Sequence, residues 1–141
     1  MSLAFTGIAS GDATTTSGVF WTRAQVSQSD TTGVSTNLTL QVSDSPDFRH
    51  PAFQKTVKTS ADNNFTAKID LTSLKPGTQY FYRWVGKDGK LDVVSSVGNF
   101  QTAFPSSSTE TFRFFHTGDA DGLMAPYLAA RNLDKENYNR S

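Results

Sequence analysis

The sequence predicts an all-β sandwich over residues 4–102, followed by a short strand–helix segment of a different kind. Several apolar runs alternate apolar and polar residues with a period of two, which is typical of half-buried strands. Clusters of Gly, Asp, Ser, Thr and Pro separate these runs, and no window between Phe5 and Thr102 has a helical apolar period. Short strands without interposed helices favour a sandwich over an α/β sheet.

The amino-acid composition limits the classes of function open to the chain. Its 141 residues suit one domain plus a tail, and the 11 Phe, 4 Tyr and 2 Trp predict an aromatic-rich core. Thirteen basic residues balance thirteen acidic ones without a clustered basic face, which argues against nucleic acid as a partner. Disulfides, thiolate metal ligands and cysteine nucleophiles are excluded because there is no cysteine. No apolar run reaches the ~18 residues of a membrane span, and residues 1–3 do not open a signal sequence, so we expect any leader to lie outside this sequence.

The first strands are predicted from alternation. Residues 18–23 read as one strand, and two further strands are set by inward-facing apolar side chains. These side chains are Leu38, Leu40 and Val42 in one strand, and Phe65, Ala67, Ile69 and Leu71 in the next.

The strand over residues 79–85 is the richest in aromatic residues. Tyr80, Tyr82 and Trp84 are expected on one of its faces. Asp88-Gly89 is a strong turn signal and predicts a hairpin toward Leu91 and Val93.

Residues 74–80, Leu-Lys-Pro-Gly-Thr-Gln-Tyr, fit a turn that enters a sandwich strand with a tyrosine corner. In that motif the Tyr80 hydroxyl bonds backbone a few residues upstream, here between Leu74 and Gly77. Trp21 is then expected as the core tryptophan of a fibronectin-type-III-like sandwich. The alternative is an ordinary Pro-Gly turn followed by a core tyrosine.

Residues 103–111 interrupt the strand pattern and predict an interdomain linker, because Pro105 and a Ser/Thr run favour turns. After them, residues 112–116 read as a dense apolar strand, followed by a Gly/Asp-rich turn and a helix near residues 125–137. Strand, turn and helix open an α/β unit, so we expect residues 112–141 to begin a second domain that this chain does not complete.

Several segments, in order, resemble the N-terminal domain of PhoD-like alkaline phosphatases. They are Phe5-Thr6-Gly7-Ile8-Ala9-Ser10-Gly11-Asp12, Gly18-Val19-Phe20-Trp21-Thr22-Arg23, Ser43-Asp44-Ser45-Pro46-Asp47-Phe48, Leu74 to Arg83, Ser96 to Thr102 and Phe112-Arg113-Phe114. The resemblance implies a fibronectin-like module ahead of a metallophosphatase domain of which residues 112–141 are the start.

The tail departs from that family pattern. PhoD-like enzymes usually carry Ser-Cys-Gln after this strand, whereas Thr117-Gly118-Asp119 stands here. This sequence is closer to the Gly-Asp-x-Gly motif of purple acid phosphatases, the related alternative family, although Gly122 comes one residue late.

The resemblance makes Asp119 the candidate metal ligand of the first block and Asp121 a weaker candidate, with helix capping or a turn as the structural alternative for each. His116 is interpreted as a bystander next to Asp119, and His50 as a surface residue of a polar loop.

The function implied is that of a non-catalytic module in a parent enzyme that hydrolyses phosphate esters at a two-metal site of iron, calcium, zinc or manganese. Its partners would be the missing catalytic domain and, in the parent, a phosphate ester. The parent is expected to be exported. This chain, with two histidines, is expected to be inactive and to bind no cofactor itself.

Two alternatives stay open. One is a stand-alone fibronectin-like binding or adhesion module, which predicts an exposed aromatic patch. The other concerns the tail, whose apolar strand can dock on its own sandwich, exchange with a neighbouring copy through self-association, or stay mobile.

Overall fold

A computed structural model describes residues 2–27 and 32–111. Within these ranges the chain forms eight strands and one turn of 3₁₀ helix, and no helix long and apolar enough to cross a membrane. The elements are β1 (Ser2–Gly11), β2 (Gly18–Ser27), β3 (Ser35–Ser43), β4 (Phe53–Ser60), η1 (Ala61–Asn63), β5 (Thr66–Leu71), β6 (Gln79–Asp88), β7 (Leu91–Val94) and β8 (Gly98–Gln101).

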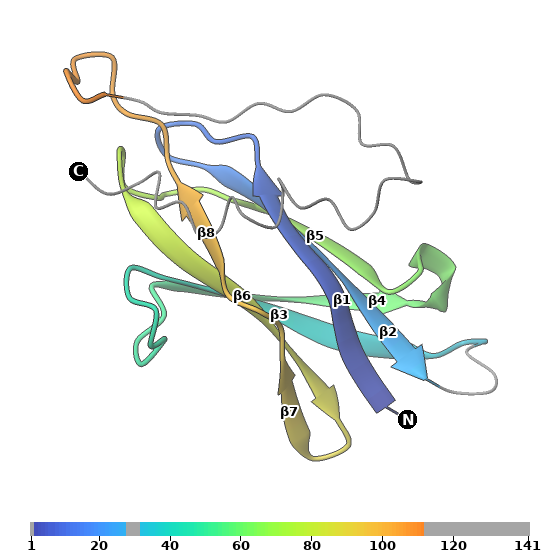
Figure 1. Ribbon diagram of the computed structural model, residues 1–141. Coiled ribbons are helices and arrows are strands. Elements are labelled where there is room, and N and C mark those ends of the chain that lie inside the picture. The colour runs from blue at the N-terminus through green and yellow to red at the C-terminus, as the bar shows by residue number, and fades with distance from the viewer. Residues whose placement is uncertain (1, 28–31, 112–141) are drawn as a thin grey trace, which may run out of the picture. The chain divides into compact units, whose positions relative to one another are not determined.

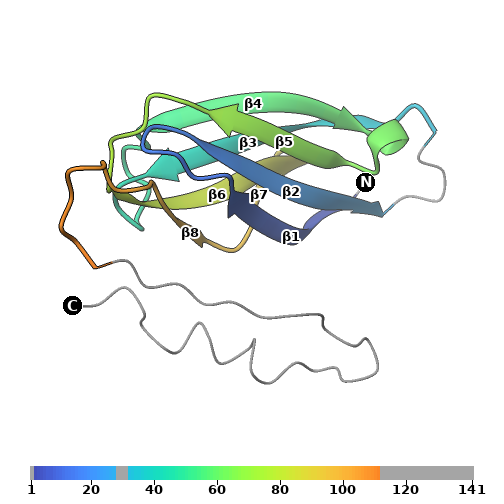
Figure 2. The same ribbon diagram turned by 90° about the horizontal axis from the view of Figure 1, so that it is seen from above.

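The strands form two antiparallel sheets. The three-stranded sheet has the order β1-β2-β5, and the five-stranded sheet has the order β4-β3-β6-β7 with β8 also paired to β6 (Figure 1). Viewed from above, β4 lies beside β5 on one side of the sandwich, and β1 lies beside β8 on the other (Figure 2). This fibronectin-type-III-like β-sandwich confirms the predicted fold class.

The core lies between the sheets and is built by the alternation read in the sequence. Leu38, Leu40 and Val42 of β3 are fully buried, and Tyr80, Tyr82 and Trp84 of β6 share the inner face as predicted. The core comprises Leu3, Phe20, Ala24, Val26, Leu38, Leu40, Val42, Phe65, Ala67, Ile69, Leu71, Leu74, Tyr80, Tyr82, Trp84 and Phe100. Phe20 packs edge-on to Tyr82 at 5.0 Å and against Phe100 at 4.9 Å, the separations that aromatic rings prefer.

The prediction that Trp21 is the core tryptophan is wrong. Adjacent strand residues face opposite ways, and the buried neighbour is Phe20 with 0% of its surface exposed. Trp21 therefore points to the outer face of its sheet, half-buried beside Gly7 of β1. Trp84, 0% exposed, is the tryptophan of the core.

Both edge strands on the β1/β8 side are irregular. The pairing of β1 with β2 shifts by one residue between Phe5 and Gly7, so Thr6 forms a bulge. On the other sheet, β7 and β8 pair in succession along the same edge of β6. Between them Ser95 stays attached, because its Oγ accepts the Trp84 N–H at 2.9 Å and its own N–H donates to the Trp84 carbonyl.

The turns use the predicted residues. Asp88 pairs with Leu91, so Gly89 and Lys90 form a two-residue hairpin loop, and Gly89 has the positive φ of 61° that such a loop requires. At the other end of β6, Gly77 has φ 58°, and its N–H donates to the Ala103 carbonyl at 3.0 Å. The ring of Phe104 lies so close that a Cβ on Gly77 would come within 2.9 Å of it.

The chain divides into two compact units, residues 1–108 and 109–141. The sandwich lies entirely in the first. The predicted strand at 112–116 and helix near 125–137 fall outside the described residues, and the domain boundaries at 102 and 111 stay predictions.

Candidate functional site

The predicted metal ligands cannot be placed. Asp119, Asp121 and His116 all lie outside the described residues, so their roles stay predictions. His50, by contrast, is exposed in the loop between β3 and β4, which confirms its interpretation as a surface residue.

The acidic and histidine side chains of the sandwich do not converge on one point. Within residues 2–27 and 32–111, no group of three or more His, Cys, Asp and Glu side chains lies close enough to hold a metal ion. Two carboxylates there are already paired with cations, Asp47 with Arg49 and Asp92 with Lys87. The described residues therefore do not fit a two-metal centre.

The buried hydroxyls of the sandwich are engaged in holding backbone or turns. Thr22 donates to the Gly7 carbonyl at 2.8 Å and so binds β2 to β1 beyond the bulge. Thr102 accepts the Thr78 N–H at 2.9 Å and donates to the Lys75 carbonyl at 2.7 Å. Hydroxyls used in this way satisfy buried polar groups and are not free to act on a ligand.

Tyr80 forms the predicted tyrosine corner. Its side chain is 3% exposed, and its hydroxyl accepts the Lys75 N–H at 2.9 Å, within the range that the sequence predicts. The bond holds the turn between β5 and β6 over the end of the core, which identifies Tyr80 as a structural residue.

The Tyr82 side chain extends from β6 to Ser10 of β1. Burial raises the pKa of its phenol above the ordinary value of 10.0, and a hydrogen bond with Ser10 offsets part of that rise. The ring passes directly over Gly98, where a Cβ would come within 2.4 Å of it. Glycine at this position is therefore required by the close approach of the ring.

A second aromatic contact lies on the outer face of the five-stranded sheet, and sequence reasoning missed it. The Arg83 guanidinium stands 4.3 Å from the centre of the Phe48 ring, and Arg83 Nε donates to Gln41 Oε1 at 2.8 Å. Phe48 is 5% exposed although it lies outside the core. The loop around Phe48 is polar in sequence, so the burial of this ring could not be predicted from the loop itself. The only sequence signal was Arg83, which faces outward on β6 and covers the ring.

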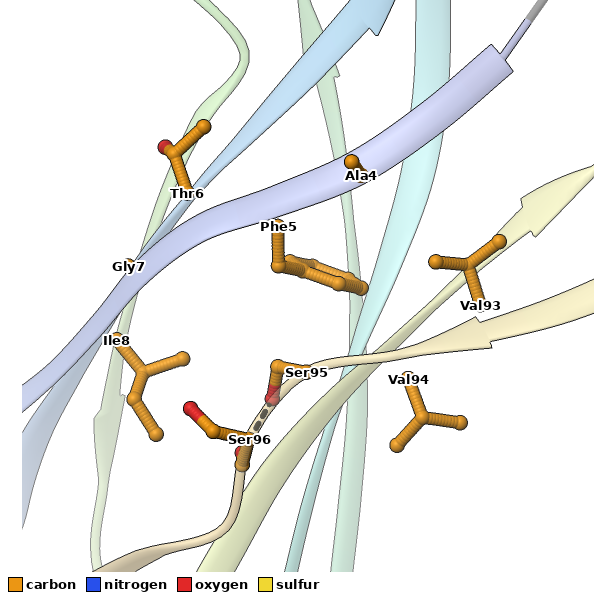
Figure 3. Close-up of a pocket in the computed structure, with 9 residues that line it drawn as sticks. All are labelled: Ala4, Phe5, Thr6, Gly7, Ile8, Val93, Val94, Ser95 and Ser96. Atoms are coloured by element: carbon orange, nitrogen blue, oxygen red, sulfur yellow. Dashed lines mark hydrogen bonds between the residues drawn. The ribbon is translucent and has the colours of Figure 1, made fainter.

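A groove of about 280 Å³ lies between the irregular edges (Figure 3). Phe5 and Ile8 of β1 line one wall, and Val93 and Val94 of β7 line the other, with Ser95 and Ser96 at its end. The groove carries no charged side chain, and Ser95 Oγ is already bonded to the Ser96 carbonyl at 2.7 Å. Its lining combines apolar side chains with the hydroxyls of Thr6, Ser95 and Ser96.

The family described as "PhoD-like phosphatase, N-terminal domain" matches residues 3–104. The chain belongs to this family. The match runs from within β1 to beyond β8, so the PhoD-like domain is the whole sandwich.

Solved structures agree with this PhoD-like fold. "Structure of PhoD" has a TM-score of 0.60 at 23% identity, and the match covers 72% of this chain but only 19% of that one. The chain thus corresponds to about a fifth of the length of that protein. The sensor domain of the anti-sigma factor RsgI4 from Pseudobacteroides cellulosolvens reaches 0.53 at 17% identity, covering 84% of this chain and 93% of that one. A computationally redesigned β-sandwich reaches 0.50 at 20% identity, covering 74% and 98%. No curated protein matches the sequence. At these identities the neighbours support the fold alone.

Proposed function

We propose that this sandwich is a non-catalytic N-terminal module of a PhoD-like metal-dependent phosphatase or phosphodiesterase. The observation that carries the proposal is the family match over residues 3–104, which takes in the strands from β1 to β8. The buried hydroxyls and the tyrosine corner support it, because the polar side chains of the interior are used to hold the fold.

In the parent enzyme, hydrolysis of a phosphate ester is proposed to take place outside the sandwich. A pair of iron, calcium, zinc or manganese ions would clamp the ester and activate a water or hydroxide. From this chain, Asp119 is the proposed first-block ligand and Asp121 the second candidate. The sandwich would position the catalytic portion and limit access to it.

The substrate and location of the parent belong to the same proposal. A phosphate mono- or diester is the expected substrate class, and export from the cytoplasm is the expected destination. Both follow from the family rather than from any residue of the sandwich.

The proposal is tested by assaying the 141-residue chain with p-nitrophenyl phosphate and bis-p-nitrophenyl phosphate, with calcium, iron, manganese or zinc added. We expect hydrolysis no faster than in the metal-only control. Robust turnover by the pure chain, abolished by Asp119→Ala, would show that the chain is itself catalytic.

A second candidate, an independent binding or adhesion module, is favoured by one observation. Trp21 lies partly exposed on the outer face of the three-stranded sheet, opposite the small residue Ala9 and beside Gly7 of β1. Reading the gene downstream of codon 141 separates the two functions. A metallophosphatase sequence there supports the first, and a stop codon or an unrelated domain supports the second.

A further inference from the structure

The edges of the two sheets meet on two sides of the sandwich, and these two sides differ sharply in the number of charged residues. On the β4/β5 side, both edge strands carry charged residues, namely Lys55 and Lys58 in β4 and Lys68 and Asp70 in β5. Charges on edge strands are the usual protection against pairing with another chain. On the β1/β8 side, the ten residues of β1 include no charged residue and no proline. The only charged residue from β7 to β8 is Asp92, which is paired with Lys87.

Exposed apolar side chains gather on this same uncharged side. Within the described ranges, the large apolar side chains most open to solvent are Leu91, Val94 and Val97, which are 73%, 45% and 48% exposed. All three belong to β7 or to the link between β7 and β8. We call these three side chains the rim. Val94 of the rim also lines the groove, together with Phe5 and Ile8 of β1, Val93 of β7 and the hydroxyl residues Thr6, Ser95 and Ser96 (Figure 3). Apolar residues grouped in this way mark an interaction surface.

The backbone of β1 adds hydrogen-bonding capacity to this surface. β1 is the outer strand of its sheet, so one row of its N–H and C=O groups has no partner strand in the sheet (Figure 1). The Thr6 bulge divides the strand into two regular stretches, Ser2–Phe5 and Gly7–Gly11. The longer stretch, Gly7–Gly11, can accept an added antiparallel strand, and it contains Ala9, whose side chain is exposed.

We propose that the uncharged side formed by β1, β7 and β8 is a self-association surface, on which β1 pairs antiparallel with β1 of a second copy of this chain. A neutral strand that pairs with itself around a two-fold axis places no like charges opposite each other. The same axis brings the Val94 and Val97 rim of one copy toward that of the other. The β4 edge could not do this, because Lys55 and Lys58 would face their own copies.

Sedimentation of the 141-residue chain over a range of concentrations tests the proposal. We expect a reversible monomer–dimer equilibrium. Ala9→Lys places a charge on the exposed outer face of β1 and should raise the dissociation constant about tenfold or more, since two lysines then approach across the axis. The matched control is Gln54→Lys on β4, an exposed edge position already flanked by lysine, and it should leave the dimer unchanged.

Val97→Ser gives a second, milder variant, which removes an exposed apolar side chain without altering a strand and should also weaken the dimer. If a variant fails to fold, amide hydrogen exchange of the unaltered chain still tests the proposal. The amides of β1 should then exchange more slowly as the protein concentration rises. A monomer at every concentration overturns the proposal. So does association that Ala9→Lys leaves unchanged, because such association uses another surface.

Discussion

At the scale of single residues, the two tryptophans show what alternation can and cannot predict. The pattern of residues 18–23 predicts a strand correctly, but this short stretch does not say which of two large aromatic residues, Phe20 and Trp21, faces inward. The structure buries Phe20 because it shares the register of Thr22, Ala24 and Val26. On β6 the choice is clear, since three aromatic residues at alternate positions fix the inner face.

The two tryptophans should therefore contribute unequally to stability. Trp84→Ala should lower the free energy of unfolding by about 3–5 kcal/mol, the usual cost of removing a large buried ring. Its indole Nε1 has no partner in the described part of the chain, so packing rather than hydrogen bonding supplies the stability. Trp21→Ala should cost clearly less. Urea unfolding of both variants checks this, and equal losses would place Trp21 in the core after all.

The tyrosine corner gives a second residue-scale prediction. Tyr80→Phe keeps the buried ring but leaves the Lys75 N–H without its acceptor, and should destabilise the fold by about 0.5–1.5 kcal/mol. Thermal or urea unfolding gives the value. An unchanged midpoint would mean that water replaces the hydroxyl at no cost and that the corner is not a stabilising feature.

At the scale of elements, the sequence predicted strands more reliably than it predicted their partners. Alternation located β3, β5 and β6, and Asp88-Gly89 located the hairpin to β7. The bulge at Thr6 and the three-residue link between β7 and β8 have no signature in the local sequence. They depend on contacts across strands, such as the bond from Thr22 to Gly7 and the attachment of Ser95 to Trp84.

Two glycines on neighbouring edge strands test the packing between elements. Gly98→Ala would drive a methyl group into the Tyr82 ring and should cost about 1–3 kcal/mol through overpacking. Gly11→Ala is the matched control, because a Cβ there meets nothing within 4 Å and its φ is not positive. Unfolding midpoints decide the comparison. Comparable effects of the two substitutions would mean that Tyr82 moves aside freely.

At the scale of the whole molecule, several ordered sequence segments identified the family, and the family match confirms it. The candidate site was harder to reach, because metal ligands of a two-metal centre come from distant parts of a chain and converge only in the folded structure. The sequence offered Asp119 and Asp121 from one turn, and both fall outside the described residues. The surface features that the structure adds, the outward Trp21 and the uncharged β1 edge, depend on which face or edge each strand presents.

The PhoD-like sandwich should fold as a self-contained module, and truncation tests this most directly. A chain ending at Thr111 keeps every contact described above, including Phe104 against Gly77 and the Ala103 bond to the Gly77 N–H. Urea unfolding of this fragment should show one cooperative transition with the midpoint of the 141-residue chain, because an intact core is enough for two-state behaviour. A control ending at Ala103 should be less stable, since it loses the Phe104 ring. Loss of the cooperative transition in the longer fragment would show that residues 112–141 belong to the same folding unit, and would contradict the claim.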